Sequence, residues 1–149
     1  MAPPIRVLTV EDDPSARLLL AGALRDLPGL ELCGQAADGL EALEQVKRLR
    51  PDVVLLDLIM PGLDGLGFLR ALERRDRPVV VVTSQAGGWE VIHCALSLGA
   101  SYYLVKPLNV QALPALLAGL TLQPLVRRAE GLLADMGAFV GAMTPEQLG

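Results

Sequence analysis

The sequence is poor in the residues that build disulfide frameworks or metal centres with nitrogen and sulfur ligands. Cysteine occurs only at Cys33 and Cys94, without the CxxC spacing of a redox or zinc motif, and the one histidine is His93. Both cysteines stand in apolar segments. This predicts two reduced thiols that pack as small hydrophobic side chains in a cytoplasmic protein.

Excess positive charge is also missing. The chain has 13 basic and 17 acidic residues, which gives a formal net charge of −4. No broad positive field is available to hold a nucleic-acid backbone, so we expect no direct nucleic-acid binding by this chain. Any such contact would have to be local or supplied by another chain.

Long apolar runs are absent as well. Nowhere do about 18 uncharged apolar residues follow one another, and the N-terminus has neither the basic lead nor the long apolar stretch of a signal peptide. We therefore expect no membrane association and a cytoplasmic location.

What is present is a regular alternation of strand and helix patterns. A chain of 149 residues with 52% hydrophobic residues can bury the core of one domain. The expected strands are 5–10, 30–36, 53–57, 78–82 and 100–105, and the expected helices are 14–27, 38–49, 64–75, 88–98 and 109–120.

Two of these strands carry the argument for the fold. Runs 53–57 and 78–82 show no polar–apolar alternation, which is typical of parallel strands covered by helices on both faces. We predict an α/β fold of the flavodoxin-like type, a doubly wound (βα)5 parallel sheet of strand order 2-1-3-4-5. It occupies residues 1–120 and is followed by an extra C-terminal helix.

Polar side chains follow four of the five predicted strands. They are Glu11, Asp12 and Asp13 after the first, Asp57 at the end of the third, Thr83 and Ser84 after the fourth, and Lys106 after the fifth. The carboxyl ends of parallel strands share one edge of a sheet, and in this order the first and third strands are neighbours. The acids should therefore converge and bind a hard cation such as Mg²⁺, with Lys106 left to neutralise a phosphoryl group.

Four ordered motifs then carry a resemblance to a known family. The segments "LTVEDDPSARLLL", "VVLLDLIMPGLDGLGFL", "VVVVTSQA" and "LGASYYLVKPLNV" resemble the receiver domain of two-component response regulators, from residue 5 to about residue 120. "DLIMPGLDGL" and "LGASYYLVKP" are especially similar to the receiver of the sporulation master regulator of endospore-forming bacteria.

The resemblance implies a phosphoryl-transfer site. Asp57 would be the phosphoacceptor, taking its phosphoryl group from a phosphohistidine on a sensor histidine kinase or histidine phosphotransfer protein. Glu11 and Asp12 would bind Mg²⁺ together with Asp57 and the backbone carbonyl of Ile59. Asp13 would be a spare acid outside the pocket.

The resemblance also implies a switch. Thr83 would bond a phosphoryl oxygen after transfer, Lys106 would pair with the same group, and the Lys106–Pro107 bond would be cis. Tyr103 matches the aromatic residue that turns inward when Thr83 moves, although an aromatic in a strand can also be plain core. Enzymatic activity would be limited to the receiver's own phosphorylation and dephosphorylation.

Two positions depart from the commonest pattern of the family. Glu11 stands where aspartate is frequent, so its longer side chain reaches the metal directly or through water. Ile59 is apolar where rapidly resetting regulators often carry a polar residue. It cannot orient a hydrolytic water, which predicts a persistent phosphoryl group.

The expected helix 88–98 has an unusual exposed face. A helical wheel with Val91 toward the core places Trp89, Ile92 and His93 toward or beside solvent. In the family this helix, the strand 100–105 and the helix 109–120 often form a homodimer or partner surface. His93 has no acid or nucleophile near it in sequence and reads as an ordinary solvated or packed histidine.

The remaining residues, 121–149, have an apolar stripe at helical spacing after Pro124. Three interpretations stay open: a packing or dimerisation helix, the start of a missing effector domain, or a frayed tail. With a DNA-binding effector, the chain would be the receiver portion of a transcription regulator. A haloacid-dehalogenase phosphatase would need an acid at Ile59, and a flavin binder would not place three acids after its first strand.

Overall fold

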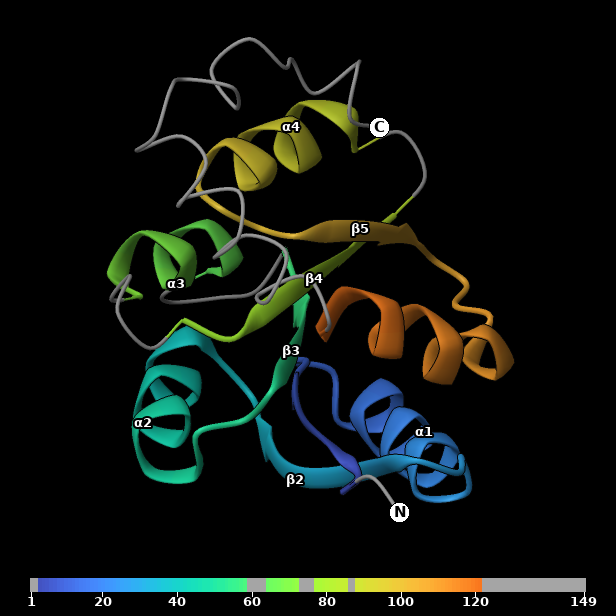
Figure 1. Cartoon of the computed structure of the whole chain (residues 1–149). Coiled ribbons are helices and arrows are strands. Elements are labelled where there is room, and N and C mark those ends of the chain that lie inside the picture. Colours follow the sequence, from blue (N-terminus) through green and yellow to red (C-terminus); the bar gives the residue numbers. More distant parts are fainter. Residues whose placement is uncertain (1–2, 59–63, 73–76, 86–87, 122–149) are drawn as a thin grey trace, which may run out of the picture.

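The computed structural model describes residues 3–58, 64–72, 77–85 and 88–121 (Figure 1). Five parallel strands form one sheet in the order β2-β1-β3-β4-β5, which confirms the predicted fold class. The strands are β1 (Ile5–Val10), β2 (Leu30–Ala36), β3 (Val53–Asp57), β4 (Val79–Ser84) and β5 (Tyr102–Val105). The expected C-terminal helix, apart from its first residue Thr121, lies outside the described residues.

Helices lie between the strands, and aspartates begin three of them. The helices are α1 (Pro14–Arg25), α2 (Gly39–Leu49), α3 (Gly65–Ala71) and α4 (Trp89–Ser97), followed by a 3-10 turn (Val110–Ala112) that continues into a helix over 113–121. The carboxylates of Asp13, Asp38 and Asp64 each accept a hydrogen bond from a backbone N–H of the first turn. These caps satisfy amide donors that have no partner inside the helix.

The sheet separates two hydrophobic clusters because successive residues of a strand point to opposite faces. One face carries Leu8, Val54 and Val80 against Ala42 of α2, Phe68 of α3 and Ile92 of α4. The other face carries Val7, Val53 and Val81 against Leu24 of α1 and Leu117 of the last helix. All five residues of β3 are buried, so this central strand holds its last residue, Asp57, in a fixed place.

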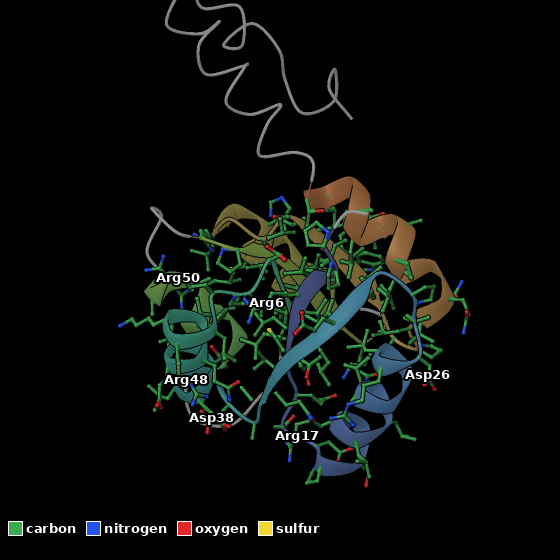
Figure 2. The ribbon with its side chains drawn as sticks, turned by 60° about the horizontal axis from the view of Figure 1, so that its bottom comes forward. Arg6, Arg17, Asp26, Asp38, Arg48 and Arg50 are labelled. Atoms are coloured by element: carbon green, nitrogen blue, oxygen red, sulfur yellow. The ribbon has the colours of Figure 1, made fainter. Side chains whose placement is uncertain are left out.

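Arg6 lies near the start of β1 (Figure 2) and anchors the connection from α2 to β3. Its Nη1 donates to the carbonyl oxygens of Leu49 and Arg50 at the end of α2. Its backbone N–H donates to Asp52 Oδ2 at 2.9 Å. The entry into β3 is therefore tied to β1 before the buried strand begins.

Two local expectations were wrong. Ile92 is buried rather than solvent-facing, because the core stripe of α4 runs through Ile92 and Ala95, with Val91 only partly buried; Trp89 and His93 are exposed as expected. Strand β4 extends to Ser84, so that Thr83 lies inside the strand instead of after it. Among the described residues, no helix is both long and apolar enough to cross a membrane.

Candidate functional site

Three carboxylates meet at the carboxyl edge of the sheet. Glu11 and Asp12 follow β1 directly, and Asp57 ends β3, which pairs with β1. One carboxylate oxygen of each residue lies within 4.8 Å of the others. Glu11 and Asp57 are only 6% and 8% exposed, so little water screens the repulsion between them.

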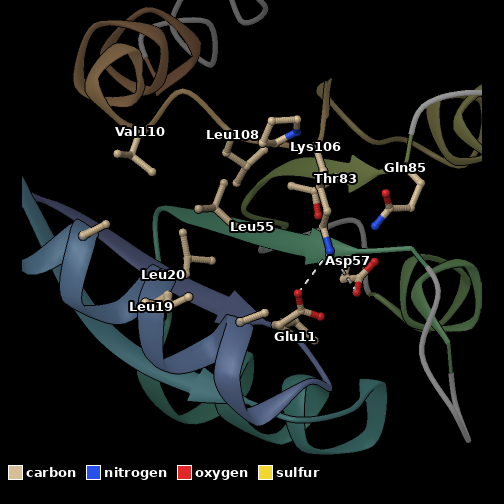
Figure 3. Close-up of a pocket in the computed structure, with 14 residues that line it drawn as sticks. Glu11, Leu19, Leu20, Leu55, Asp57, Thr83, Gln85, Lys106, Leu108 and Val110 are labelled. Atoms are coloured by element: carbon tan, nitrogen blue, oxygen red, sulfur yellow. Dashed lines mark hydrogen bonds and ion pairs between the residues drawn. The ribbon is translucent and has the colours of Figure 1, made fainter.

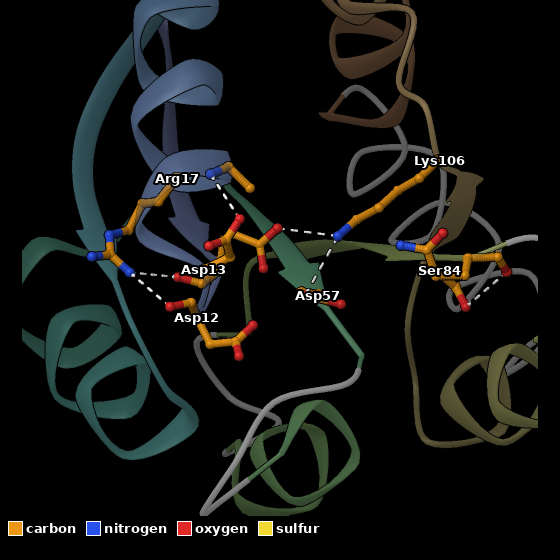
Figure 4. Close-up of polar contacts among 9 residues, drawn as sticks. Asp12, Asp13, Arg17, Asp57, Ser84 and Lys106 are labelled. Atoms are coloured by element: carbon orange, nitrogen blue, oxygen red, sulfur yellow. Dashed lines mark hydrogen bonds and ion pairs between the residues drawn. The ribbon is translucent and has the colours of Figure 1, made fainter.

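Lys106 brings a positive charge into this acidic cluster (Figure 4). Its Nζ lies 3.1 Å from Glu11 Oε1 and 3.5 Å from Asp57 Oδ2. The residue follows β5, its peptide bond to Pro107 is cis, and its backbone N–H donates to Ser84 O at 2.8 Å. The backbone of β4 thus holds the lysine opposite the acids.

The protonation equilibria reflect this crowding. Burial raises the pKa of Glu11, and its hydrogen bond with Asp57 acts in the same direction, while Lys106 offsets part of the rise. Burial lowers the pKa of Lys106, but the hydrogen bond with Glu11 and the charge of Asp57 outweigh burial and raise it. Lys106 pairs with two of the three converging carboxylates, so a bound cation would relieve the remaining repulsion.

The donor set fits a hard divalent cation. Glu11, Asp12 and Asp57 offer only oxygen atoms, and oxygen ligands suit Mg²⁺ or Ca²⁺ better than zinc or copper. Asp12 is half-buried and leaves the cluster open on one side for water or a phosphoryl oxygen. The carbonyl of Ile59, expected as a further ligand, lies outside the described residues.

Thr83 stands beside Asp57 because β3 and β4 pair in register at these two residues. The N–H of Leu58 donates to the carbonyl oxygen of Thr83 at 3.2 Å and closes the strand pair at the site. Thr83 is 5% exposed, and it lines the same cavity as Asp57 and Lys106 (Figure 3).

This cavity is an apolar groove of about 630 Å³ that runs along α1 to the acids. Its apolar walls come from α1, β3 and the segment after β5, and include Leu19, Leu20, Leu55, Leu108 and Val110. Leu19 is 76% exposed and Leu18 beside it 72%, so α1 also presents apolar side chains outside the groove. The acids are therefore approached across an apolar surface.

Comparison with known proteins places this arrangement in a family. The family model of the response regulator receiver domain matches residues 7–118. This chain belongs to that family. The receiver also superposes on solved structures with TM-scores of 0.68 and 0.73. They are the response regulator domain of Thermotoga maritima CheB, 32% identical with 78% of this chain and 93% of that chain covered, and the NarL signal receiver domain of Mycobacterium tuberculosis, 30% identical with 80% and 98% covered.

The curated relatives of the receiver are larger proteins. It is 47% identical over 133 residues to protein-glutamate methylesterase/protein-glutamine glutaminase 5 of Myxococcus xanthus, covering 88% of this chain and 38% of that protein. It is also 47% identical over 106 residues to such a protein of Xanthomonas campestris, covering 70% and 30%. The chain spans about a third of the length of these relatives.

The narrower resemblance to the sporulation master regulator has no support in these comparisons, where CheB-type receivers stand instead. The two motifs behind it, "DLIMPGLDGL" and "LGASYYLVKP", surround Asp57 and Lys106. The geometry of the site is common to receivers and constrains the residues around it. These motifs therefore identify the family but do not distinguish its subfamilies.

Tyr103 lies on the other face of the receiver's sheet from Thr83. It packs against the cluster beneath α4, and its Cα partner on β4 is Val82, the residue before Thr83. The rings of Trp89 and Tyr103 meet edge to face with centroids 5.9 Å apart, and Tyr102 stacks on Tyr103 at 6.0 Å. Trp89 and Tyr102 are 57% and 42% exposed, so these three rings form an aromatic surface over α4 and β5.

Two residues at the start of α1, its cap Asp13 and Arg17 in its first turn, differ from or add to the prediction from the sequence. Asp13, expected outside the pocket, caps α1 and also lines the cavity around the acids. Arg17 was not singled out, yet its Nη1 donates to the carbonyl oxygen of Glu11 at 2.8 Å and to that of Asp12 at 3.4 Å. Its place one helical turn after Asp13 is the sequence signal that could have pointed to it.

Proposed function

We propose that this receiver is a phosphorylation switch whose phosphoacceptor is Asp57. The donor would be a phosphohistidine on a sensor histidine kinase or histidine phosphotransfer protein, in the cytoplasm. The observation that carries the proposal is the placement of the Asp57 carboxylate between the acid pair Glu11 and Asp12 and the ammonium group of Lys106. Receiver domains of two-component systems take phosphoryl groups from histidine kinases, which supports this donor.

In the proposed reaction, one oxygen of Asp57 forms a bond to phosphorus while the bond from phosphorus to the donor's imidazole nitrogen breaks. The nitrogen keeps the electron pair and later takes a proton. The rigid β3 strand fixes the direction of attack. Lys106 and the Thr83 hydroxyl then bond the new phosphoryl oxygens.

Mg²⁺ held by Glu11, Asp12 and Asp57, with the Ile59 carbonyl as a further ligand, would neutralise charge on the transferring group. We expect the chain's own chemistry to end at its phosphorylation and dephosphorylation. The apolar Ile59, two residues after Asp57 in the sequence, still predicts slow loss of the phosphoryl group.

The output is proposed to involve the surface formed by α4, β5 and the helix over 113–121. Phosphorylation adds charge and acceptor oxygens, and closure of Thr83 on them would bias this surface between two shapes. The aromatic surface of Trp89, Tyr102 and Tyr103 supports a protein partner here, because exposed aromatic rings are enriched at interfaces. A second copy of this chain is one such partner, and the homodimer would form through this surface or through the C-terminal helix.

The relatives suggest that the partner of this surface is an effector domain in the same protein. We propose that residues 1–120 act as the regulatory unit of a protein-glutamate methylesterase, with 121–149 as the helical connection to it. The similarity to the Myxococcus xanthus protein covers 88% of this chain and so continues beyond the described helices. A DNA-binding effector is the alternative, with no direct nucleic-acid contact by this chain.

Intact-mass spectrometry with light scattering tests the switch. The protein is treated with Mg²⁺ and acetyl phosphate beside Asp57→Ala and the matched variant Asp26→Ala, which removes an exposed aspartate at the end of α1. A gain of one phosphoryl group in the wild type and Asp26→Ala, but not in Asp57→Ala, supports the proposal. No gain by folded, Mg²⁺-bound protein contradicts it and indicates a receiver that works through constitutive contacts.

A further inference from the structure

The loop between β1 and α1 is short and wholly acidic. β1 ends at Val10 and α1 begins at Pro14, so Glu11, Asp12 and Asp13 make the whole connection. Asp13 is held as the cap of α1, accepting from the backbone N–H of Ala16 at 3.1 Å. The other two residues carry the candidate cation ligands.

Arg17 reaches back from α1 to this loop (Figure 4). Its own backbone N–H donates to Asp13 O at 2.9 Å in the first helical turn, which places the side chain close behind the acid pair. Nη1 donates to the carbonyl oxygens of Glu11 and Asp12, and the side chain is half-buried. One rigid guanidinium group thus holds two consecutive peptide groups.

Holding these peptide groups has a consequence for the carboxylates. The orientation of a peptide group sets the direction of the neighbouring Cα–Cβ bonds, and hence where the carboxylates of Glu11 and Asp12 stand. Three converging carboxylates repel one another, so a short loop without an anchor would relax and separate them. Backbone anchoring by Arg17 opposes that relaxation.

We propose that Arg17 is a positioning residue that keeps Glu11 and Asp12 in the geometry needed to bind Mg²⁺. This inference rests on the magnesium site of the proposed function. Charge alone would act in the opposite direction, because a cation near the acids weakens Mg²⁺ binding. When Arg17 is replaced by an uncharged residue, loss of positioning should weaken Mg²⁺ binding, whereas loss of the positive charge alone should strengthen it.

Calorimetric titration with Mg²⁺ separates them, using Arg17→Met, Arg17→Lys and the matched control Arg25→Met. Arg25 is exposed at the end of the same helix, and its replacement removes the same charge. We expect Arg17→Met to weaken Mg²⁺ binding about tenfold, as for other groups that orient metal ligands from outside. Arg17→Lys, which can bond one carbonyl, should recover part of the loss, and Arg25→Met should bind like the wild type.

Thermal unfolding without Mg²⁺ accompanies the titrations, so that affinity is compared only where each variant is fully folded. Arg17→Lys keeps the test available should Arg17→Met not fold. Mg²⁺ affinity of Arg17→Met within twofold of the wild type, or tighter, would overturn the proposal, as would equal weakening in Arg25→Met. Absence of Mg²⁺ binding by the wild type is a different failure, because it removes the magnesium site of the proposed function and this inference with it.

Discussion

Lys106 and Glu11 are separated by 95 residues in the chain and meet with Nζ 3.1 Å from Oε1, closer than Lys106 lies to Asp57. Glu11 is thus the nearer of the two carboxylate partners of the lysine. Lys106 is thereby paired with a proposed metal ligand before any phosphoryl group arrives. Phosphorylation would require this ion pair to open or to be shared.

Replacing Lys106 tests what this pair contributes to the fold. The chain has only two lysines, and Lys47 is exposed on α2, so Lys47→Met is a matched control. We expect Lys106→Met to lower the free energy of unfolding by about 2 kcal/mol at neutral pH, since a charged hydrogen-bond donor to two buried carboxylates is lost. Urea denaturation measures this, and equal stability of the two variants would contradict it.

The raised pKa of Glu11 predicts a pH dependence of stability. A carboxyl group with a higher pKa in the folded than in the unfolded protein favours folding at low pH, and this contribution is lost as pH rises through the folded pKa. Glu11→Gln cannot titrate. Its stability relative to the wild type should therefore rise from about pH 4.5 upward and then level off. Urea denaturation of both proteins between about pH 4 and pH 7 gives the difference in the free energy of unfolding. A fall in the relative stability of Glu11→Gln over this range would contradict the raised pKa of Glu11.

Gly65 leaves room for the end of β3 to pass the start of α3. A Cβ atom there would lie 2.8 Å from the carbonyl oxygen of Asp57 and 2.8 Å from Leu58 Cα, both of which are backbone atoms. Gly65→Ala should cost about 1–3 kcal/mol and slow phosphorylation of Asp57 by acetyl phosphate, because α3 must move away from the site.

Gly22 is the matched control for that substitution. It lies within α1, and a Cβ there would meet nothing within 4 Å, so Gly22→Ala should stabilise the protein by about 0.5–1 kcal/mol. Unfolding and phosphorylation rates are compared for both variants. Normal phosphorylation of a destabilised Gly65→Ala protein would show that the contact supports the fold alone.

Trp89 offers an optical report on the aromatic surface. It is the one tryptophan of the chain and touches Tyr103 edge to face. We expect acetyl phosphate with Mg²⁺ to change its fluorescence in the wild type, because the environment of Tyr103 would shift with Thr83. Asp57→Ala and Tyr103→Leu should both lose the change. A full response in Tyr103→Leu would argue against a switch role for this tyrosine.

The fold was largely predictable because its signals are local. The bounds of β1, β2 and β3 agree with the predicted 5–10, 30–36 and 53–57, where proline, glycine and aspartate flank the apolar runs. β4 was placed too early, since Thr83 and Ser84 look like loop residues although neighbouring strands pair with them. The rotation of α4 was misjudged at Ile92 because apolar residues occur on several sides of that helix.

The acids of the site were predictable from strand ends alone, because parallel strands deliver them to one edge. That Lys106 lies closer to Glu11 than to Asp57 was not, since the sequence gives the strand ends but no distances between side chains. Neither was the contact of Arg17, because its partners are backbone carbonyl oxygens, and its place one helical turn after Asp13 is the only sequence signal for it.

Because Thr83 and Tyr103 lie on opposite faces, the sheet separates the acidic site from the aromatic surface. Asp57 lines the cavity on the side of α1, and Tyr103 of the aromatic surface packs on the side of α4. Val82, the β4 partner of Tyr103, is adjacent to Thr83, so the β4 backbone is the shortest covalent link between the two faces, and the proposed phosphorylation signal would pass along it. Because the two sites use different side chains, substitutions on the α4 face would leave the proposed phosphoryl pocket intact, and one proposed input could acquire new partners during evolution.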